Sequence, residues 1–265
     1  MSFQTQYGQW ALVAGASEGL GAGYAKELAS RGLNLVLVAR RSELLQTLSM
    51  QISETYHVQI ITLALDLSSP ESLDQILQAT NELEIGLLVY NAAYSAVGPF
   101  LDTALDGHIR ELNTNIRAPL YLTYLLGQRM LARGHGGIVL MSSLSAYQGS
   151  AYISAYAATK AFNIVLAEGL WEEWRTRGVD VLVCVAGAVK TPNYLASEPE
   201  KTGGPGDMTM APAIVVREAL NTLGRQPYVI PGRMNRVSSF VMRHLLPRKS
   251  AIKFMGKVLR DMYVK

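Results

Sequence analysis

The sequence predicts an α/β fold: a single doubly wound parallel sheet of the Rossmann-like kind, followed by a helical C-terminal extension. Apolar runs of strand length alternate with longer helical patterns along the chain. The strand candidates are apolar at successive positions, which is typical of parallel strands that are buried on both faces. A glycine-rich segment joins the first strand to the first helix, as a tight turn requires.

Seven strands and six major helices are expected, in alternation along the chain. Gly32 marks the stop of the first helix, and Ser69 with Pro70 marks the start of the third. The strands are expected at residues 10–14, 34–38, 59–64, 86–90, 137–141, 179–185 and 228–230. The helices are expected at residues 22–30, 42–54, 70–82, 106–132, 155–177 and 213–223.

Length and composition favour one globular domain. The chain has 265 residues, of which 49% are hydrophobic, enough for a sizeable core. Because Cys184 is the single cysteine, no internal disulfide is possible, and a reducing compartment is favoured. Cys184 lies in an apolar run, which is typical of a thiol in the core. The N-terminus has neither a charged start nor an apolar stretch, and no run approaches the roughly 18 apolar residues of a membrane-spanning helix. We therefore expect no signal peptide, no span and a cytoplasmic location.

The glycine-rich segment after the first strand has the spacing Gly-x-x-x-Gly-x-Gly. Glycines permit a tight turn and a close approach of bare backbone to a pyrophosphate, while amide groups at the start of a helix point at the anion. We therefore expect a nucleotide-binding loop formed by Gly15, Ser17, Gly19, Leu20 and Gly21. The alternative is an ordinary glycine-rich turn between a strand and a helix.

The end of the second strand indicates which dinucleotide would bind. An acid at this position suits the ribose 2′-hydroxyl of NAD, whereas a basic side chain suits the 2′-phosphate of NADP. The strand ends at Arg40 and Arg41, and guanidinium groups bind phosphate through paired hydrogen bonds. We expect NADP(H), with Arg40 at the 2′-phosphate and Ser17 as a second contact, unless both arginines simply lie in solvent. Asp66, after the third strand, could border the adenine or cap the next helix.

A serine, a tyrosine and a lysine follow the fifth strand. Ser143 lies at the end of that strand, and Tyr156 and Lys160 are four residues apart on an expected helix, so they share a face. A free tyrosine has a pKa near ~10, and a nearby ammonium favours the phenolate and lowers that pKa. The pair could therefore give or take a proton while a hydride moves to or from a nicotinamide. Such a pair is also common on ordinary helix surfaces.

Together these segments resemble the short-chain dehydrogenase/reductase family, over essentially the whole chain to about Gly232. Residues 7–10 and 38–41 resemble the NADP(H)-preferring branch that contains ketoacyl and hydroxysteroid reductases. The resemblance implies that Ser143 binds the substrate oxygen and that Tyr156 is the proton donor or acceptor. It also implies that Lys160 binds the nicotinamide ribose and tunes Tyr156.

The resemblance implies three further site residues. Asn115 would anchor a water of a proton relay, with Asn113 as a weaker match. Asn91 would border the cofactor after the fourth strand, and Thr191 would hold the carboxamide. The chain departs from the family's pattern without losing a catalytic group, where Thr, Gly and Pro are replaced by Ala14, Ala93 and Ala186.

We expect an oxidoreductase that transfers a hydride between NADP(H) and a carbonyl or secondary alcohol carbon. One alternative is a non-catalytic nucleotide-binding sensor or scaffold, although a sensor has no need for Tyr156. Another is an epimerase or dehydratase of nucleotide sugars, for which the chain has little length left. A bulky apolar substrate is expected, because the loops at the strand ends have aromatic and aliphatic side chains and no cluster of Arg or Lys. These side chains are Tyr94, Val97, Phe100, Leu144, Tyr147, Tyr152, Val189, Tyr194 and Leu195.

Residues 1–232 are expected to form the catalytic and cofactor-binding domain, and 233–265 a basic helical extension of the same domain. Within the first part, residues 187–212 form a long irregular stretch after a strand, which predicts a lid. From Arg225 to Lys265 there are ten Lys and Arg residues and one acid, against 14 basic and 20 acidic residues elsewhere. The extension has two apolar stripes broken at Pro247, namely Val237, Phe240, Val241 and Leu245, then Ile252, Met255, Leu259 and Met262.

The extension has two interpretations. We favour a helical cap over the sheet or the pocket mouth, and the alternative is peripheral contact with a membrane surface. The resemblance implies a homodimer or tetramer through the helices at 106–132 and 155–177. The four histidines are scattered, so no metal site is expected, and no nucleic-acid-binding module is recognised.

Overall fold

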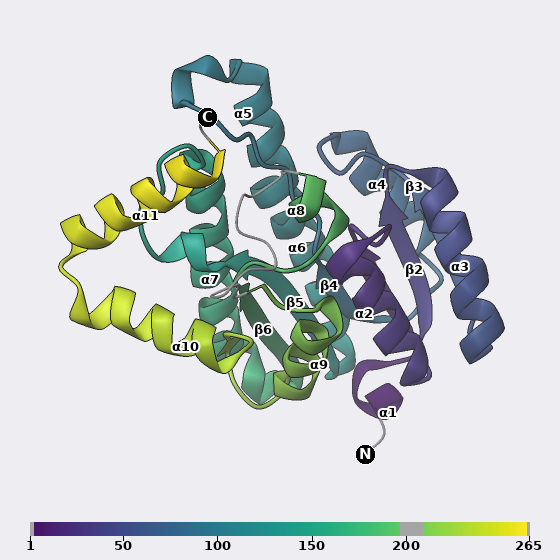
Figure 1. The fold of residues 1–265 in the computed structure, drawn as a ribbon. Helices are drawn as coiled ribbons and strands as arrows, with labels where there is room; N and C mark the ends of the chain where they lie inside the picture. Colours follow the sequence, from purple (N-terminus) through teal and green to yellow (C-terminus); the bar gives the residue numbers. More distant parts are fainter. Residues whose placement is uncertain (1–2, 197–208, 264–265) are drawn as a thin grey trace.

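A computed structural model describes residues 3–196 and 209–263 and confirms the doubly wound parallel sheet (Figure 1). The described residues form one sheet of seven parallel strands in the order β3-β2-β1-β4-β5-β6-β7. The bounds of β1 are those predicted, and those of the other six strands differ from the predicted ones by one or two residues. The strands are β1 (Trp10–Ala14), β2 (Asn34–Ala39), β3 (Ile60–Ala64), β4 (Ile85–Tyr90), β5 (Gly136–Ser143), β6 (Val179–Ala186) and β7 (Tyr228–Val229).

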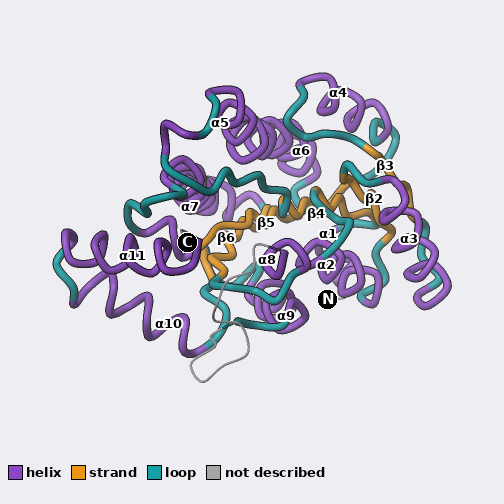
Figure 2. Tube along the Cα trace, turned by 45° about the horizontal axis from the view of Figure 1, so that its top comes forward, coloured by secondary structure: helices purple, strands orange, loops and turns teal. Residues whose placement is uncertain are grey.

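Helices cover both faces of the sheet, as Figure 2 shows. One apolar layer packs the sheet against α2 (Gly19–Ser30), α3 (Ser42–Tyr56) and α9 (Pro212–Thr222). The other layer packs it against α4 (Pro70–Ala79), α6 (Ala118–Arg133) and α7 (Ser154–Trp174). Short helical segments complete the body: α1 (Phe3–Tyr7), η1 (Phe100–Asp102), η3 (Leu144–Tyr147), η4 (Arg175–Arg177) and α8 (Pro192–Ala196).

Burial of the strands follows their place in the sheet. Every residue of β1 and β4 is buried, as continuous apolar runs predict. By contrast, β3 is only partly buried, because it lies at the edge of the sheet next to β2 alone. Cys184 is buried in β6, and burial raises the pKa of its thiol to about 12, in keeping with a core residue.

The strand order reverses between β1 and β4, and this reversal creates the crevice for a ligand. The chain runs outward from β1 to β2 and β3 and then returns to β4 on the other side of β1. Ligands of such sheets bind beyond the carboxyl ends of the strands at this point. The loop after β4 is fixed there because the backbone amides of Asn91 and Ala92 both donate to the Ala14 carbonyl over 2.9 Å.

Two predictions need correction: the long helix at residues 106–132 and the irregular stretch at residues 187–212. The long helix predicted at 106–132 is broken into α5 (Leu105–Leu112), a π-helical turn η2 (Asn113–Arg117) and α6. The stretch at 187–212 is not wholly irregular, because α8 lies within it and Val189 forms a bridge with Met210. The middle of the predicted lid, residues 197–208, lies outside the described residues.

The C-terminal extension forms two helices beside α7 (Figure 1). They are α10 (Arg233–Phe240), which continues into a π-helical turn η5 (Val241–Leu245), and α11 (Arg248–Tyr263). The predicted break at Pro247 is confirmed. The tail holds the segment that follows β5, because Arg248 donates to the Tyr147 carbonyl over 2.6 Å and Arg260 to the Tyr152 hydroxyl over 3.2 Å. In the described chain, no helix combines the length and apolar character that crossing a bilayer requires.

Candidate active site

The glycine loop is held tightly between β1 and the start of α2. The backbone amides of Gly15 and Ala16 donate to the Val38 carbonyl over 2.7 and 3.1 Å. A Cβ on Gly21 would lie 1.9 Å from the Gly15 carbonyl oxygen, so no other residue fits there. Because α2 begins at Gly19, three residues before the predicted start, the first amide groups of the helix lie within the loop.

A cleft of about 330 Å³ opens at the reversal point of the sheet. It is bounded by the loop after β1, the end of β2, the loop after β4 and the start of α7. Nine of the predicted site residues line it together: Gly15, Ser17, Gly19, Leu20, Arg40, Asp66, Asn91, Tyr156 and Thr191. Gly21 is not a lining residue; it packs against the Gly15 carbonyl within the loop.

The cleft suits the phosphate end of a dinucleotide. Gly15 and Gly19 line it with bare backbone. A Cβ at Gly19 would lie 2.8 Å from the Thr191 side chain, and one at Gly15 would lie 2.6 Å from the Ala92 backbone. The exposed Arg40 lies at its rim, with Arg41 beside it. Arg41 is held by an ion pair to Glu18 at 2.6 Å and donates to the Ser17 hydroxyl over 3.2 Å. Both arginines therefore present cationic groups to the cleft.

Asp66 is fixed at the far side of the cleft by an arginine that the sequence did not reveal. The Arg110 guanidinium donates to Asp66 over 2.7 Å and lies 5.2 Å from the centre of the Tyr94 ring. Partial burial raises the pKa of Asp66, but hydrogen bonds from Ser68 and the Arg110 charge outweigh burial and hold the pKa below its usual value. The other Asp66 oxygen accepts from the Ser68 amide and hydroxyl, in a turn before α4 rather than as the helix cap.

Tyr156 and Lys160 lie on one face of α7, as the four-residue spacing predicts. The half-buried Tyr156 lines the cleft, and the Lys160 ammonium is 5.5 Å from the centre of its ring. Lys160 is only 3% exposed and donates to the Met141 carbonyl of β5 over 3.1 Å. Burial lowers the pKa of this lysine to about 8, while the Glu111 carboxylate raises it. An ammonium beside a phenol favours the phenolate, so the pair is suited to giving or taking a proton.

Asn115 lies in the π-helical turn and joins the loop after β4 to α7. Its side-chain oxygen accepts from the Tyr94 amide over 2.9 Å. Its amide group donates to the Tyr94 carbonyl over 2.8 Å and to the Thr159 hydroxyl, one residue before Lys160, over 3.0 Å. π-helical turns are rare and often occur at functional sites. This network involves Asn115 rather than Asn113.

Ser143 is the last residue of β5 and is not among the residues that line the 330 Å³ cleft. Its hydroxyl oxygen accepts from the Ser145 amide over 3.3 Å and from the Ser145 hydroxyl over 3.0 Å. Because Ser143 acts as the acceptor in both bonds, its own proton can be donated to a substrate oxygen. The neighbouring Ser142 donates to the Lys160 carbonyl over 2.8 Å and so ties α7 to β5. The supporting role of Ser145 was not predicted, although it follows Ser143 closely in sequence.

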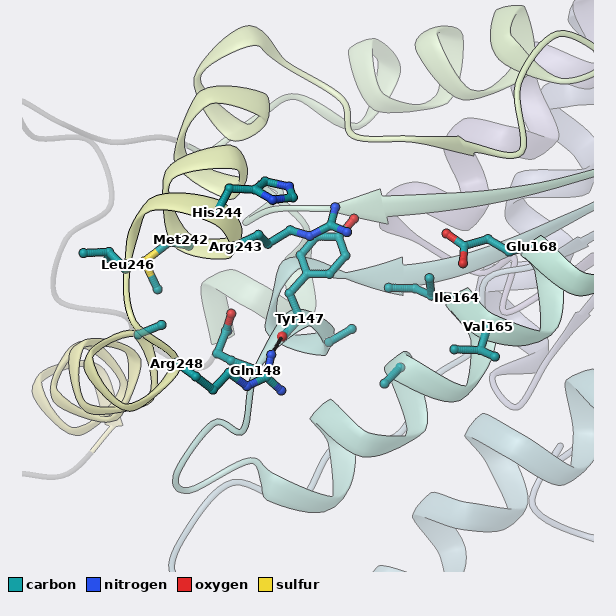
Figure 3. Close-up of a pocket in the computed structure, with 13 residues that line it drawn as sticks. Tyr147, Gln148, Ile164, Val165, Glu168, Met242, Arg243, His244, Leu246 and Arg248 are labelled. Carbon is teal, nitrogen blue, oxygen red and sulfur yellow. Dashed lines mark hydrogen bonds between the residues drawn. The ribbon is translucent and has the colours of Figure 1, made fainter.

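A second cavity of about 380 Å³ lies between η3, α7 and the C-terminal helices (Figure 3). It shares no lining residue with the first cleft. The Arg243 guanidinium lies 4.1 Å from the centre of the Tyr147 ring, and Arg248 reaches the same tyrosine's backbone. The tail therefore packs on the segment that begins just after Ser143, as a cap would.

Comparison with known families identifies the class of protein. Residues 9–201 match the short chain dehydrogenase family, and the chain belongs to it. It is an oxidoreductase of the class that acts on alcohol and carbonyl groups.

Two relatives show the extent of the sequence similarity. The chain is 30% identical to a 7beta-hydroxysteroid dehydrogenase of Mediterraneibacter gnavus, over 98% of this chain and 100% of the relative. It is 32% identical to a very-long-chain 3-oxoacyl-CoA reductase of Rattus norvegicus, over 97% of this chain and 83% of that one.

Solved structures agree in fold. One of a 7beta-hydroxysteroid dehydrogenase superposes with a TM-score of 0.92 at 30% identity, covering 97% of this chain and 100% of the other. A short-chain dehydrogenase from Sphingobium yanoikuyae in complex with NADPH gives 0.76 at 29% identity, covering 84% and 86%. The resemblance carried by the motifs is thereby confirmed at the level of the family.

Proposed function

We propose that this chain is an NADP(H)-dependent carbonyl reductase, or alcohol dehydrogenase in the reverse direction, for a bulky apolar substrate. The observation that carries the proposal is the position of Tyr156 in a cleft lined by the glycine loop, with the buried Lys160 ammonium 5.5 Å from the centre of its ring. A nucleotide-binding sensor needs the loop but not the buried lysine beside the tyrosine.

The end of β2 supports NADP(H) over NAD. Arg40 and Arg41 stand where an acid would otherwise accept a ribose hydroxyl, and both line the cleft. Arg41 is already oriented by Glu18 and Ser17, so its free donors can meet a phosphate without much loss of side-chain entropy. The relative from Sphingobium, which was solved with NADPH, supports the same choice.

Each residue has a definite task in the proposed reaction. When bound, the nicotinamide supplies or accepts the hydride. Ser143 donates a hydrogen bond to the substrate oxygen, and Tyr156 gives that oxygen its proton during reduction or removes it during oxidation. The Lys160 ammonium favours the phenolate and binds the nicotinamide ribose. Asn115 anchors the water through which the proton is replaced.

The substrate is proposed to be a ketone of fused rings or a long acyl chain. Of the aromatic and aliphatic side chains expected around the site, Tyr94 lines the cleft, where Leu65 and Leu67 also lie. The tail packs on the segment after Ser143, where Arg248 donates to the Tyr147 carbonyl. The named relatives act on hydroxysteroids or 3-oxoacyl-CoA, which are substrates of these two kinds.

Turnover of NADPH with a panel of steroid ketones, 3-oxoacyl thioesters and small ketones tests the proposal. We expect the bulky ketones to be reduced and Tyr156→Phe to lose at least about a hundredfold in kcat while still binding NADPH. Tyr228→Phe, at a tyrosine of β7 that is 46% exposed, is the matched control and should keep full activity. Binding of NADPH without turnover of any ketone would favour the sensor instead.

We also propose that two copies associate through α6 and α7. Leu120 and Tyr124 on α6 are 44% and 62% exposed, and Val165 on α7 is 71% exposed. Exposed apolar side chains on adjacent helices are typical of a contact between subunits. Light scattering should give a mass at least twice that of the chain, and Val165→Glu should shift it toward one chain.

A further inference from the structure

A carboxylate and an arginine form an ion pair at the end of the cleft where the base of a nucleotide would lie. The glycine loop follows β1, and Arg40 and Arg41 follow β2. A dinucleotide with its pyrophosphate on the loop and its ribose 2′-phosphate at these arginines has its base beyond β2, toward β3. Asp66 follows β3 and lines the cleft there. Its neighbours Leu65 and Leu67 also line the cleft and offer apolar surface to a purine ring.

The Asp66 carboxylate has room for one more hydrogen bond. An ionised carboxylate only accepts hydrogen bonds, at about four lone-pair positions. Oδ1 accepts from the Ser68 amide over 3.0 Å and from the Ser68 hydroxyl over 2.9 Å, and Oδ2 accepts from the Arg110 guanidinium over 2.7 Å. Within residues 3–196 and 209–263 no fourth donor reaches this carboxylate, and 39% of the side chain is exposed. One position on Oδ2 is therefore left for a ligand in the cleft.

Arg110 fixes the direction of this carboxylate from α5. Its guanidinium carbon lies 5.2 Å from the centre of the Tyr94 ring while Nη2 donates to Asp66. The Tyr94 backbone is itself held by the Asn115 side chain, over 2.9 and 2.8 Å. Arg110 and Tyr94 both line the cleft, and 38% of the arginine side chain is exposed. The arginine therefore joins the turn after β3 to the loop after β4 across one end of the cleft.

We propose that Arg110 is a positioning residue for recognition of the base: its ion pair fixes the Asp66 carboxylate so that the open position on Oδ2 accepts the exocyclic amine of adenine. This inference rests on the proposed use of NADP(H). The exocyclic amine donates, so it is complementary to an ionised carboxylate. Hypoxanthine has a carbonyl at the same ring position, which would bring a second acceptor against Asp66. The pair therefore selects between two purines of the same shape.

Binding of NADPH and of its hypoxanthine counterpart tests this role without turnover. In fluorescence titrations the wild type should prefer the adenine form by at least about tenfold, because a carboxylate would otherwise face a carbonyl. Arg110→Met keeps the length but removes the charge and the donor, so the preference should fall below about threefold. Arg110→Lys keeps a charged donor for the single bond to Oδ2 and should restore it to above about fivefold. Arg177→Met, at an exposed arginine of η4, is the control and should bind both forms like the wild type.

Two results would overturn the proposal. Equal losses of affinity for the two forms in Arg110→Met, with the preference unchanged, would mean that Arg110 only attracts phosphates or supports the loops. The second test uses Asp66→Asn, which can donate an amide hydrogen to hypoxanthine and should itself lose the preference. Adding Arg110→Met to Asp66→Asn should change the preference no further, because the arginine acts through the carboxylate. A preference that survives in Asp66→Asn would show that Asp66 does not read the base.

The same titrations separate this inference from the proposed function. NADH and its hypoxanthine counterpart offer the same choice of purine, so a protein that binds NADH in place of NADPH would contradict the proposed cofactor and leave the role of Arg110 intact. An adenine preference that depends on Arg110, in a protein that reduces no ketone, would contradict only the proposed reaction. A protein that binds neither dinucleotide would contradict both proposals. Arg110→Gln, a second neutral variant, gives the same comparison if Arg110→Met does not fold.

Discussion

Replacing Lys160 by Met should make the protein more stable at neutral pH while abolishing its activity. The reason is the burial of the ammonium, which lowers the pKa from 10.5 to about 8. At about 1.36 kcal/mol per pKa unit, this gap corresponds to about 3 kcal/mol of differential free energy. Methionine has a similar shape and no charge. Loss of the hydrogen bond to Met141 subtracts about 1 kcal/mol, so the net gain near pH 7 should be about 2 kcal/mol.

The sign of the pH dependence is fixed by the lowered pKa. Below pH 8 the lysine is protonated in both the folded and the unfolded chain, and the full cost of burial is present. Between pH 8 and 10.5 the unfolded chain binds more protons, so the free energy of unfolding of the wild type rises with pH relative to the variant. The advantage of Lys160→Met should therefore shrink steadily over this window.

Urea unfolding followed by circular dichroism at several pH values between 7 and 10 measures both curves. Lys253→Met, at an exposed lysine of α11, is the control and should run parallel to the wild type. Parallel curves for Lys160→Met as well would refute the reasoning, because they would show that the buried lysine titrates like a free one.

Three more perturbations probe the glycine loop, the arginine pair and the tail. Gly21→Ala should weaken NADPH binding at least tenfold, because the alanine Cβ would lie 1.9 Å from the Gly15 oxygen and would distort the loop. NADPH fluorescence measures the affinity, and binding within twofold of the wild type would contradict the tight loop. Arg40→Ser combined with Arg41→Ser should raise the KM for NADPH by about one to two orders of magnitude, as loss of about 1.5–3 kcal/mol implies, with little effect on the KM for NADH. Equal effects on both cofactors would argue against a 2′-phosphate site. Truncation after Leu246 should leave liposome co-sedimentation unchanged if the tail is a cap, whereas reduced pelleting would indicate membrane binding.

The sheet was predictable because buried parallel strands leave a strong trace in the sequence. A short, continuous apolar run such as residues 179–185 is typical of a strand that is covered on both faces, and the structure places β6 there. The glycine loop and the Tyr156–Lys160 pair were equally visible, since tight turns and helical spacing are local properties. The structure brings all of them to one edge of the sheet.

Other parts of the site could not be predicted, because they depend on contacts between distant segments. Glu111 and Arg110 lie next to each other in a helical pattern where charged residues normally face solvent. In the structure one is fully buried beside α7, and the other reaches Asp66. The π-helical turn was hidden for a related reason: residues 106–132 have the pattern of one continuous helix, and an extra residue per turn leaves no local mark in composition.

The π-helical turn allows Asn115 to face α7 and the apolar side of α6 to face the sheet, which one continuous α-helix would not allow together. Each residue of an α-helix advances by about 100°, so one added residue rotates everything downstream by that angle. The polar side chain of Asn115 can thus reach Thr159 while Leu122 and Leu126 remain in the core. Deleting Thr114 would restore a regular helix and turn the apolar stripe of α6 away from β4. With the extra residue of the π-helical turn, the direction of the Asn115 side chain and the packing of α6 on the sheet are set separately.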